Sequence, residues 1–275
     1  RGRGPARLRL NDGHSIPQLG LGLWQVREDS TASTVKTALD LGYRLVDGAA
    51  IYGNEVGQGE GIRASGLPRD EVFVTTKVWN SEQGYDRTLR AVDASLARLG
   101  LTHVELCLIH WPTPGRDRYL DTWRALIRAR EDGKIRSIGV SNFMAPHLER
   151  LVGETGVVPV LNQIELNPRL QQAELRALHD RMGIVTQSWT PLGQGASFGA
   201  APVRAAAARM GKSPAQVILR WHVQLGVSVI PRSTRVAGLT ENLDVFDVCL
   251  TPEDMAAMAT LDEGVRCGPD PMTFA

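Results

Sequence analysis

The chain has 275 residues, 43% of them hydrophobic, which is enough to bury the core of one large domain. Its 31 Lys and Arg residues nearly balance its 30 Asp and Glu residues. It therefore lacks the basic excess that holds a nucleic-acid backbone or an anionic membrane surface, and we expect a small-molecule partner, no nucleic acid and no membrane.

The cysteines and the N-terminal residues give indications of the cellular compartment of the protein. Cys107, Cys249 and Cys267 are odd in number and lack disulfide or metal-site spacing, which favours a reducing, cytoplasmic compartment. No apolar run approaches the roughly 20 residues of a membrane-spanning helix. Residues 1–7 carry charge with no hydrophobic segment behind them, and we expect a disordered tail there. No composition break divides the chain, so residues 1–275 are expected to form a single domain, and we expect a monomer.

The first expected element is a hairpin, because Asn11-Asp12-Gly13 is a turn signal between the short apolar segments Leu8–Leu10 and Ser15–Ile16. Eight β-branched and apolar segments then predict strands. They are Leu19–Leu23, Tyr43–Asp47, Val72–Lys77, Val104–His110, Ile135–Val140, Val160–Ile164, Ile184–Ser188 and Val227–Ile230.

Helical patterns, with apolar residues three and four positions apart, lie between these strands. They are Ser30–Leu41, Arg87–Leu99, Tyr119–Glu131, Gln172–Met182 and Ala215–Gln224, and a further helix start and a final helix are expected in Ser233–Asn242 and Glu253–Met258. Asp29-Ser30 is the expected N-cap of the first helix, Gly42 its stop, and Ser213-Pro214 a second N-cap. Alternation of strand and helix, eight times in a chain of this length, predicts an α/β fold, a (β/α)8 TIM barrel whose bottom the N-terminal β-hairpin closes.

Four titratable residues, Asp47, Tyr52, Lys77 and His110, lie at or just beyond the ends of three expected strands. In TIM-barrel enzymes the catalytic residues lie at the carboxyl ends of the strands, so these side chains should meet at one end of the barrel. Tyrosine is a weak acid with a pKa of about 10, but a lysine cation nearby favours the phenolate and makes the hydroxyl a better proton donor. Asp47 can hold Lys77 charged, and His110 can hydrogen-bond the oxygen that receives the proton.

Each of these residues could instead have only a structural role. Asp47 and Lys77 could form only a buried ion pair, Tyr52 could be a surface aromatic, and His110 a satisfied core imidazole. Their convergence at strand ends favours a site that polarises a carbonyl.

At these residues the chain resembles the aldo-keto reductases, and within them it looks most like the bacterial 2,5-diketo-gluconate reductases. The resemblance extends from the hairpin to about Asp262. The segments that carry it are Gly42–Glu55, Lys77–Asn80, Leu96–Gly100, Ile109–Pro112, Gly139–Asn142, Asn162–Glu165, Ser188–Gly195, Ile230–Ser233 and Glu241-Asn242.

The resemblance implies an NADPH-dependent oxidoreductase that reduces aldehydes and ketones, such as small carbonyls, dicarbonyls or keto-sugars, to alcohols. A nicotinamide cofactor would give hydride to the carbonyl carbon while Tyr52 protonates the oxygen, Lys77 and Asp47 tune it, and His110 orients the substrate.

The same resemblance assigns a cofactor site, and tryptophans at strand ends predict a substrate wall. Ser141, Asn142 and Gln163 should hydrogen-bond the carboxamide and Trp189 should stack on the nicotinamide, whereas Leu192, Gly193 and Gln194 should run beside the pyrophosphate unless they form a plain turn. Trp24, Trp79 and Trp111, which also follow strand ends, should wall the substrate pocket, the alternative being that they only pack.

The phosphate end of the cofactor departs from the family pattern. Arg232, Ser233 and Thr234 should bind a 2′-phosphate, and Glu241 and Asn242 belong to the same expected site. The arginine usually found five residues after the serine is Gly238 here, so we expect NADPH to be preferred and NADH also accepted. Gly48 replaces the usual threonine or serine after the aspartate.

Two other functions remain open on the sequence. Lys77 could form a Schiff base, as in a lyase, or the barrel could bind nicotinamide without catalysis. The histidines show no zinc spacing, so no metal site is expected, and Gly57-Gln-Gly-Glu-Gly61 departs from a phosphate-binding loop and reads as the start of the second helix.

Overall fold

The structure is a computed structural model that describes residues 5–275. Within them, eight parallel strands form one sheet in chain order, from β3 to β10. They are β3 (Leu21–Gly22), β4 (Leu45–Asp47), β5 (Phe73–Val78), β6 (Val104–Ile109), β7 (Ile135–Ser141), β8 (Leu161–Glu165), β9 (Val185–Trp189) and β10 (Ser228–Val229). The first and last strands meet, because Leu19 bridges Val229 in parallel and the Gly20 N–H donates to the Val229 carbonyl at 2.9 Å. The predicted barrel is confirmed.

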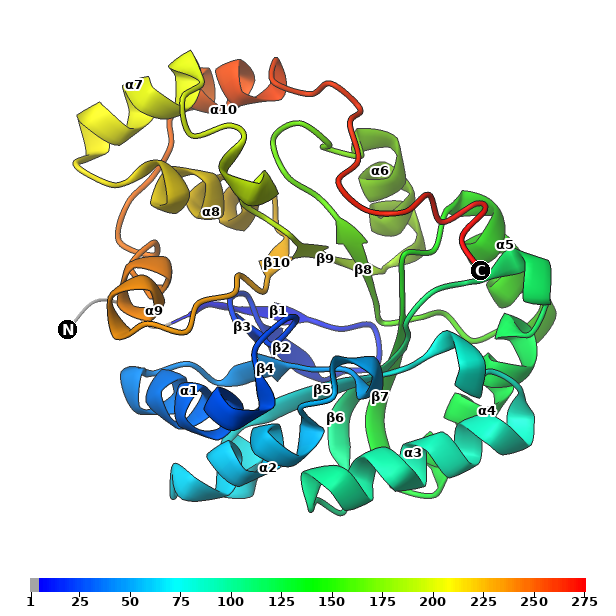
Figure 1. Cartoon of the computed structure of the whole chain (residues 1–275). Coiled ribbons are helices and arrows are strands. Elements are labelled where there is room, and N and C mark those ends of the chain that lie inside the picture. The colour runs from blue at the N-terminus through cyan, green and yellow to red at the C-terminus, as the bar shows by residue number, and fades with distance from the viewer. Residues whose placement is uncertain (1–4) are drawn as a thin grey trace.

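Ten α-helices of the described chain surround the strands (Figure 1). They are α1 (Glu28–Leu41), α2 (Glu55–Ala64), α3 (Tyr85–Leu99), α4 (Tyr119–Glu131), α5 (Ala145–Thr155), α6 (Ala173–Met182), α7 (Ala201–Met210), α8 (Pro214–Gln224), α9 (Val236–Leu243) and α10 (Pro252–Ala259). Short 3₁₀ turns lie at η1 (Ala50–Tyr52), η2 (Arg69–Glu71), η3 (Asn80–Glu82), η4 (Pro114–Arg116) and η5 (Gly193–Gly195). The expected strands and helices are found at their predicted places, while α5 and α7 had no counterpart in the prediction.

Two of the three predicted helix boundaries are confirmed. Gly42 ends α1 in the left-handed conformation at φ 113°, and Ser213 caps α8 by accepting the Gln216 N–H. The prediction of Asp29-Ser30 as an N-cap is wrong, because α1 already begins at Glu28 and its N-cap residue, Arg27, makes no side-chain cap. Acidic residues in the first turn favour the helix through its dipole instead.

The N-terminal hairpin pairs β1 (Arg7–Arg9) with β2 (Ser15–Pro17). Asn11, in its turn, donates from Nδ2 to the carbonyls of Pro159 and Gly183, which precede β8 and β9, so the hairpin covers the bottom of the barrel as predicted. The predicted tail of residues 1–7 is wrong at Arg7, which belongs to β1 because its backbone pairs with Pro17. Residues 1–4 lie outside the described residues.

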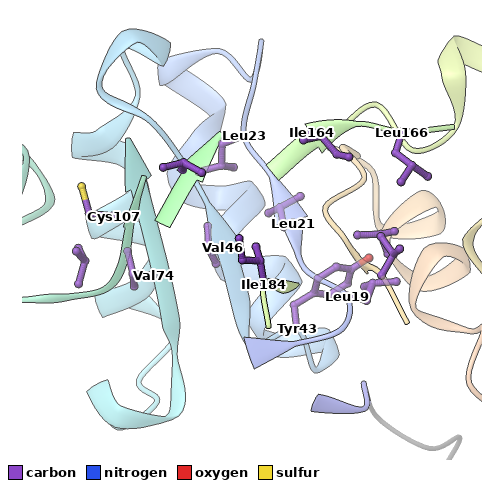
Figure 2. Close-up of a cluster of buried hydrophobic side chains, with 14 of the residues drawn as sticks. Leu19, Leu21, Leu23, Tyr43, Val46, Val74, Cys107, Ile164, Leu166 and Ile184 are labelled. Carbon is purple, nitrogen blue, oxygen red and sulfur yellow. The ribbon is translucent and has the colours of Figure 1, made fainter. Parts of the chain in front are cut away.

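The core lies inside the barrel and between the barrel and its helices. Figure 2 shows Leu19, Leu21 and Leu23 converging with residues of other strands. The α2 and α3 backbones approach so closely that a Cβ at Gly59 would lie 1.9 Å from the Leu99 carbonyl oxygen, which requires glycine. The glycine-rich segment therefore lies inside α2, as expected. No helix of the described residues is long and apolar enough to span a membrane.

Candidate active site

The four titratable residues meet at the carboxyl end of the barrel. Asp47 is the last residue of β4, Lys77 lies in β5, His110 follows β6, and Tyr52 ends the η1 turn that begins three residues after β4. Adjacent parallel strands in register bring these ends side by side.

Lys77 is the centre of the group. Its ammonium, fully buried, donates to Asp47 Oδ2 at 2.8 Å, to the Gly48 carbonyl at 2.9 Å and to the Tyr52 hydroxyl at 3.2 Å. An ammonium has three N–H groups, so all its donors are used. Lys77 is thus fixed against both the carboxylate and the phenol.

Burial and charge act in opposite directions on this pair. Burial raises the pKa of Tyr52, the Lys77 cation lowers it, and the Asp47 carboxylate raises it again, so that the pKa lies above its usual value. The sequence predicted that the lysine would lower the pKa of the phenol. This lowering effect is present, but it is smaller than the raising effect of burial. Burial also lowers the pKa of Lys77, but Asp47 and Tyr52 outweigh it and the pKa is raised. At neutral pH the site therefore holds an ammonium beside a neutral phenol.

His110 is neutral. Burial, and then the Lys77 cation, lower its pKa well below the usual value. Its ring lies 5.8 Å from the Tyr52 ring between centroids, at 81°. Nδ1 is buried without a hydrogen-bond partner, and Nε2 likewise forms no hydrogen bond with any described residue, so Nε2 is free to bind a ligand.

Two of the three predicted wall tryptophans flank His110. The Trp79 ring lies edge-on to it at 5.1 Å, and the Trp111 ring lies nearly parallel to it at 6.5 Å. Phe274, which the sequence analysis did not assign, packs against Trp111 at 4.6 Å. Trp24 is 47% exposed and makes no aromatic contact in the described chain, so it lies outside this cluster.

The residues predicted to bind the carboxamide form a second hydrogen-bonded group. Ser141 Oγ donates to the Gln163 carbonyl at 2.7 Å, Asn142 Nδ2 donates to the His110 carbonyl at 3.0 Å, and Trp189 Nε1 donates to Asn142 Oδ1 at 2.8 Å. Ser141 ends β7, Asn142 follows it, Gln163 is the middle residue of β8 and Trp189 ends β9, so the barrel brings them together toward its carboxyl end.

Gln163 joins the two groups. Its Nε2 donates to Asp47 Oδ1 at 2.8 Å and to Gln187 Oε1 at 2.8 Å. Because a carboxylate can only accept, the amide orientation is determined, and Oε1 of Gln163 is left without a donor among the described residues. Gln187 was missed by the sequence analysis; a polar residue inside an apolar strand was the available signal.

Gly48 has a steric explanation. A Cβ at this position would lie 2.2 Å from Gln58 Oε1, so a larger residue requires the Gln58 side chain to move. The Gly48 carbonyl still accepts from Lys77. The departure from the family pattern therefore leaves the ammonium's hydrogen bonds intact.

The residues expected at the far end of the cofactor lie on other loops. Gly193 and Gln194 adopt φ 58° in the η5 turn after β9, next to Leu192, so they form a left-handed turn at the mouth. Arg232 is exposed and donates to Gln25 Oε1 at 3.1 Å. Gly238 lies against Ser233, since a Cβ there would be 2.3 Å from Ser233 Oγ.

The remaining expected cofactor residues do not join the central network. Thr234 is exposed in the same loop as Arg232, and Glu241 and Asn242 lie in α9. The Glu241 carbonyl accepts from Gln216 Nε2, which ties α9 to α8. Within residues 5–275, no group of three metal-binding side chains is present.

The chain is similar to known proteins over nearly its whole length. The Aldo/keto reductase family model matches residues 18–263. An aldo-keto reductase of Mycolicibacterium smegmatis is 51% identical and methylglyoxal reductase DkgA of Escherichia coli 43% identical, each over 98% of both chains. The crystal structure of a Gox0644 variant in complex with NADPH is similar with a TM-score of 0.95 and 46% identity, covering 99% of this chain and 100% of that one. The chain belongs to the aldo/keto reductase family.

Proposed function

We propose that this protein reduces small aldehydes and ketones to alcohols with NADPH, and that Tyr52 is the proton donor. The observation that carries the proposal is the Lys77 ammonium, held 2.8 Å from Asp47 Oδ2 and 3.2 Å from the Tyr52 hydroxyl at the barrel mouth. Family membership and the NADPH complex of the similar Gox0644 variant support the choice of reaction and cofactor.

The residues beside this group fit a nicotinamide. Gln163 Oε1 is an unused acceptor suited to a primary amide N–H, and the half-buried Trp189 indole, which is bonded to Asn142, offers a flat aromatic face. Ser141 and Asn142 complete the proposed carboxamide site. When bound, the cofactor supplies the hydride.

Tyr52 and Lys77 would handle the proton. The neutral phenol can give its proton to the oxygen of the carbonyl as negative charge develops there. The phenolate left behind is stabilised by the ammonium 3.2 Å away, which Asp47 keeps charged and in place. His110, being neutral, would donate its Nε2 proton to the same oxygen and orient the substrate.

The aromatic walls favour small or planar carbonyl substrates. Trp79 and Trp111 flank His110, so apolar rings surround one polar group, and Trp24 is exposed near the same end of the barrel. We propose dicarbonyls, keto-sugars and simple aldehydes, in keeping with the methylglyoxal reductase named among the relatives.

NADPH should be preferred over NADH, and NADH should still be accepted. Arg232, Ser233 and Thr234 are proposed to bind the 2′-phosphate, with Glu241 and Asn242 near the same end. Gly238 contributes no charge there, which weakens discrimination between the two cofactors.

A lyase mechanism through Lys77 is disfavoured. Schiff-base formation needs a neutral amine, whereas the pKa of this lysine is raised by Asp47 and Tyr52 against the lowering effect of burial, and all three of its donors are engaged. Borohydride trapping with a keto substrate should give no covalent adduct.

The three free cysteines support a reducing compartment, and we propose a single-domain cytoplasmic monomer that works without a metal.

The decisive experiment replaces Tyr52 with phenylalanine. Tyr52→Phe should lower kcat/KM for carbonyl reduction by roughly 10²–10⁴, the range for a positioned general acid, with NADPH affinity unchanged. The assay is NADPH absorbance loss, with calorimetric titration of the cofactor. Equal loss of cofactor binding and rate would contradict the assignment, and a wild-type protein that binds NADPH without turnover would be a non-catalytic barrel.

A further inference from the structure

We infer that Glu165 is a positioning residue that anchors the C-terminal segment and, through it, sets the indole of Trp189. The inference rests on the proposed function of Trp189 as the nicotinamide platform. Glu165 itself touches neither the proposed proton donor nor its lysine.

The anchor is a buried carboxylate bound to distant main chain. Glu165 ends β8 and is fully buried. Its Oε2 accepts the Cys267 N–H at 2.6 Å, and its Oε1 accepts the Gly268 N–H at 2.9 Å. Both oxygens are therefore committed to two successive amides roughly a hundred residues further along the chain.

A buried carboxylate is costly unless it is paired or well hydrogen-bonded. Among the described residues Glu165 forms no salt bridge, so the two amides are what compensate the lost hydration of its charge. Charge-assisted hydrogen bonds of this kind are stronger and shorter than neutral ones. Cys267 and Gly268 are consequently held in one place relative to the end of β8.

That place is directly against Trp189. A Cβ built on Gly268 would lie 2.6 Å from Trp189 Cη2, so the glycine backbone lies on the benzene edge of the indole. At the pyrrole ring of the same indole Trp189 Nε1 donates to Asn142 Oδ1 at 2.8 Å. The indole is thus held at its N–H by a side-chain amide and bounded at its benzene ring by the main chain that Glu165 holds.

The same segment reaches the substrate wall. It leaves α10 and runs past α6 toward α5, drawn in red in Figure 1. Near its start Arg169 pairs with Glu263 at 2.8 Å, and at its end Phe274 packs on Trp111 at 4.6 Å. Glu165 lies between these two attachments, so release at Cys267-Gly268 should disturb Trp189 first and Trp111 second.

The test compares Glu165→Gln with Glu263→Gln. Glu165→Gln removes the charge and one acceptor, whereas Glu263→Gln weakens an exposed ion pair of the same segment that does not touch Trp189. Hydrogen exchange by NMR at the Cys267 and Gly268 amides reports the anchoring. Calorimetry gives the NADPH dissociation constant, and steady-state kinetics with methylglyoxal separates KM from kcat.

Glu165→Gln should lose roughly one charge-assisted hydrogen bond. We therefore expect hydrogen exchange at both amides to become at least about tenfold faster and the NADPH dissociation constant to rise about tenfold. KM should rise by a larger factor than kcat falls. Glu263→Gln should change none of these more than about twofold. Gly268→Ala would place a methyl against Trp189 Cη2 and 3.3 Å from Glu165 Oε1, and it should weaken NADPH binding. If Glu165→Gln does not fold, unchanged NADPH affinity in Gly268→Ala would overturn the positioning role.

Unchanged exchange in Glu165→Gln would overturn the anchoring. Faster exchange with unaltered NADPH affinity and KM would overturn the positioning role. Hydrogen exchange and NADPH affinity can both be measured without turnover. Failure of this inference is therefore distinguishable from failure of the proposed function, in which the wild-type protein would not reduce carbonyls.

Discussion

Replacing Lys77 with methionine tests the charge arrangement on which the proposed chemistry depends. The substitution keeps the length of the side chain and removes three hydrogen bonds, to Asp47 Oδ2, the Gly48 carbonyl and the Tyr52 hydroxyl. Asp47, 1% exposed, then keeps only the Gln163 amide at Oδ1. Removing one partner of a buried ion pair costs about 3–5 kcal/mol, because the other charge is left uncompensated.

The loss should be visible in unfolding. For a protein of this size each kcal/mol shifts Tm by about 2–4 °C, so Lys77→Met should lower Tm by roughly 10 °C. The pKa of Lys77 is raised in the folded protein, so its contribution is complete below the usual pKa of 10.5 and is lost only as the pH rises through the folded value. The difference between variant and wild type should therefore stay constant from pH 7 to about 9.

The double variant Asp47→Asn, Lys77→Met removes both charges and should be more stable than Lys77→Met alone. Lys36→Met, which breaks an exposed ion pair with Asp40, is the matched control and should cost under about 1 kcal/mol. The assay is urea unfolding together with calorimetry. If Lys77→Met is as stable as Lys36→Met, or the double variant is no more stable than the single one, the reasoning from a desolvated ion pair is refuted.

Two further predictions concern cofactor choice and acid stability. Gly238→Arg should raise the ratio of kcat/KM for NADPH over that for NADH about tenfold by adding a phosphate contact. Gly238→Ala crowds Ser233 Oγ without adding charge and should not raise this ratio, so equal ratios in the two variants would contradict the assignment. Burial lowers the pKa of His179 and His222 to about 4. As the pH falls, these histidines therefore take up protons in the unfolded chain before they do so in the folded protein, and the free energy of unfolding should decrease between pH 6.5 and 4. At pH 5 each histidine should have lowered it by roughly 2 kcal/mol. In unfolding measured as a function of pH, His222→Gln should make that decline less steep, and His14→Gln, at an exposed position, should not. If the stability of His222→Gln and of the wild type declined in parallel with pH, the role of His222 in acid destabilisation would be refuted.

Much of the fold could be predicted because its signals are local. Each strand is a short apolar run and each helix repeats at three and four residues, so the alternation is readable along the chain. Asp47, Lys77 and His110 were identifiable for the same reason, since a polar residue ending an apolar strand points to the carboxyl end of the barrel. The helices α5 and α7 were missed although they follow the same alternation.

Other features depend on contacts between distant segments. The net effect on the pKa of Tyr52 is a balance of burial, Lys77 and Asp47, and burial exists only after the barrel closes. The fit of Gly48 against Gln58 likewise requires α2 to pack on the end of β4.

The sequence by itself determined the order of strands and helices and the residue types at the mouth, because both follow from periodicity and from position along one strand. Only the tertiary structure decided that Glu165 holds Cys267 and Gly268 and that Gln163 links Asp47 to Gln187. Hydrogen bonds between such distant residues leave no local pattern, since their geometry is defined by barrel closure and by the path of the C-terminal segment across it.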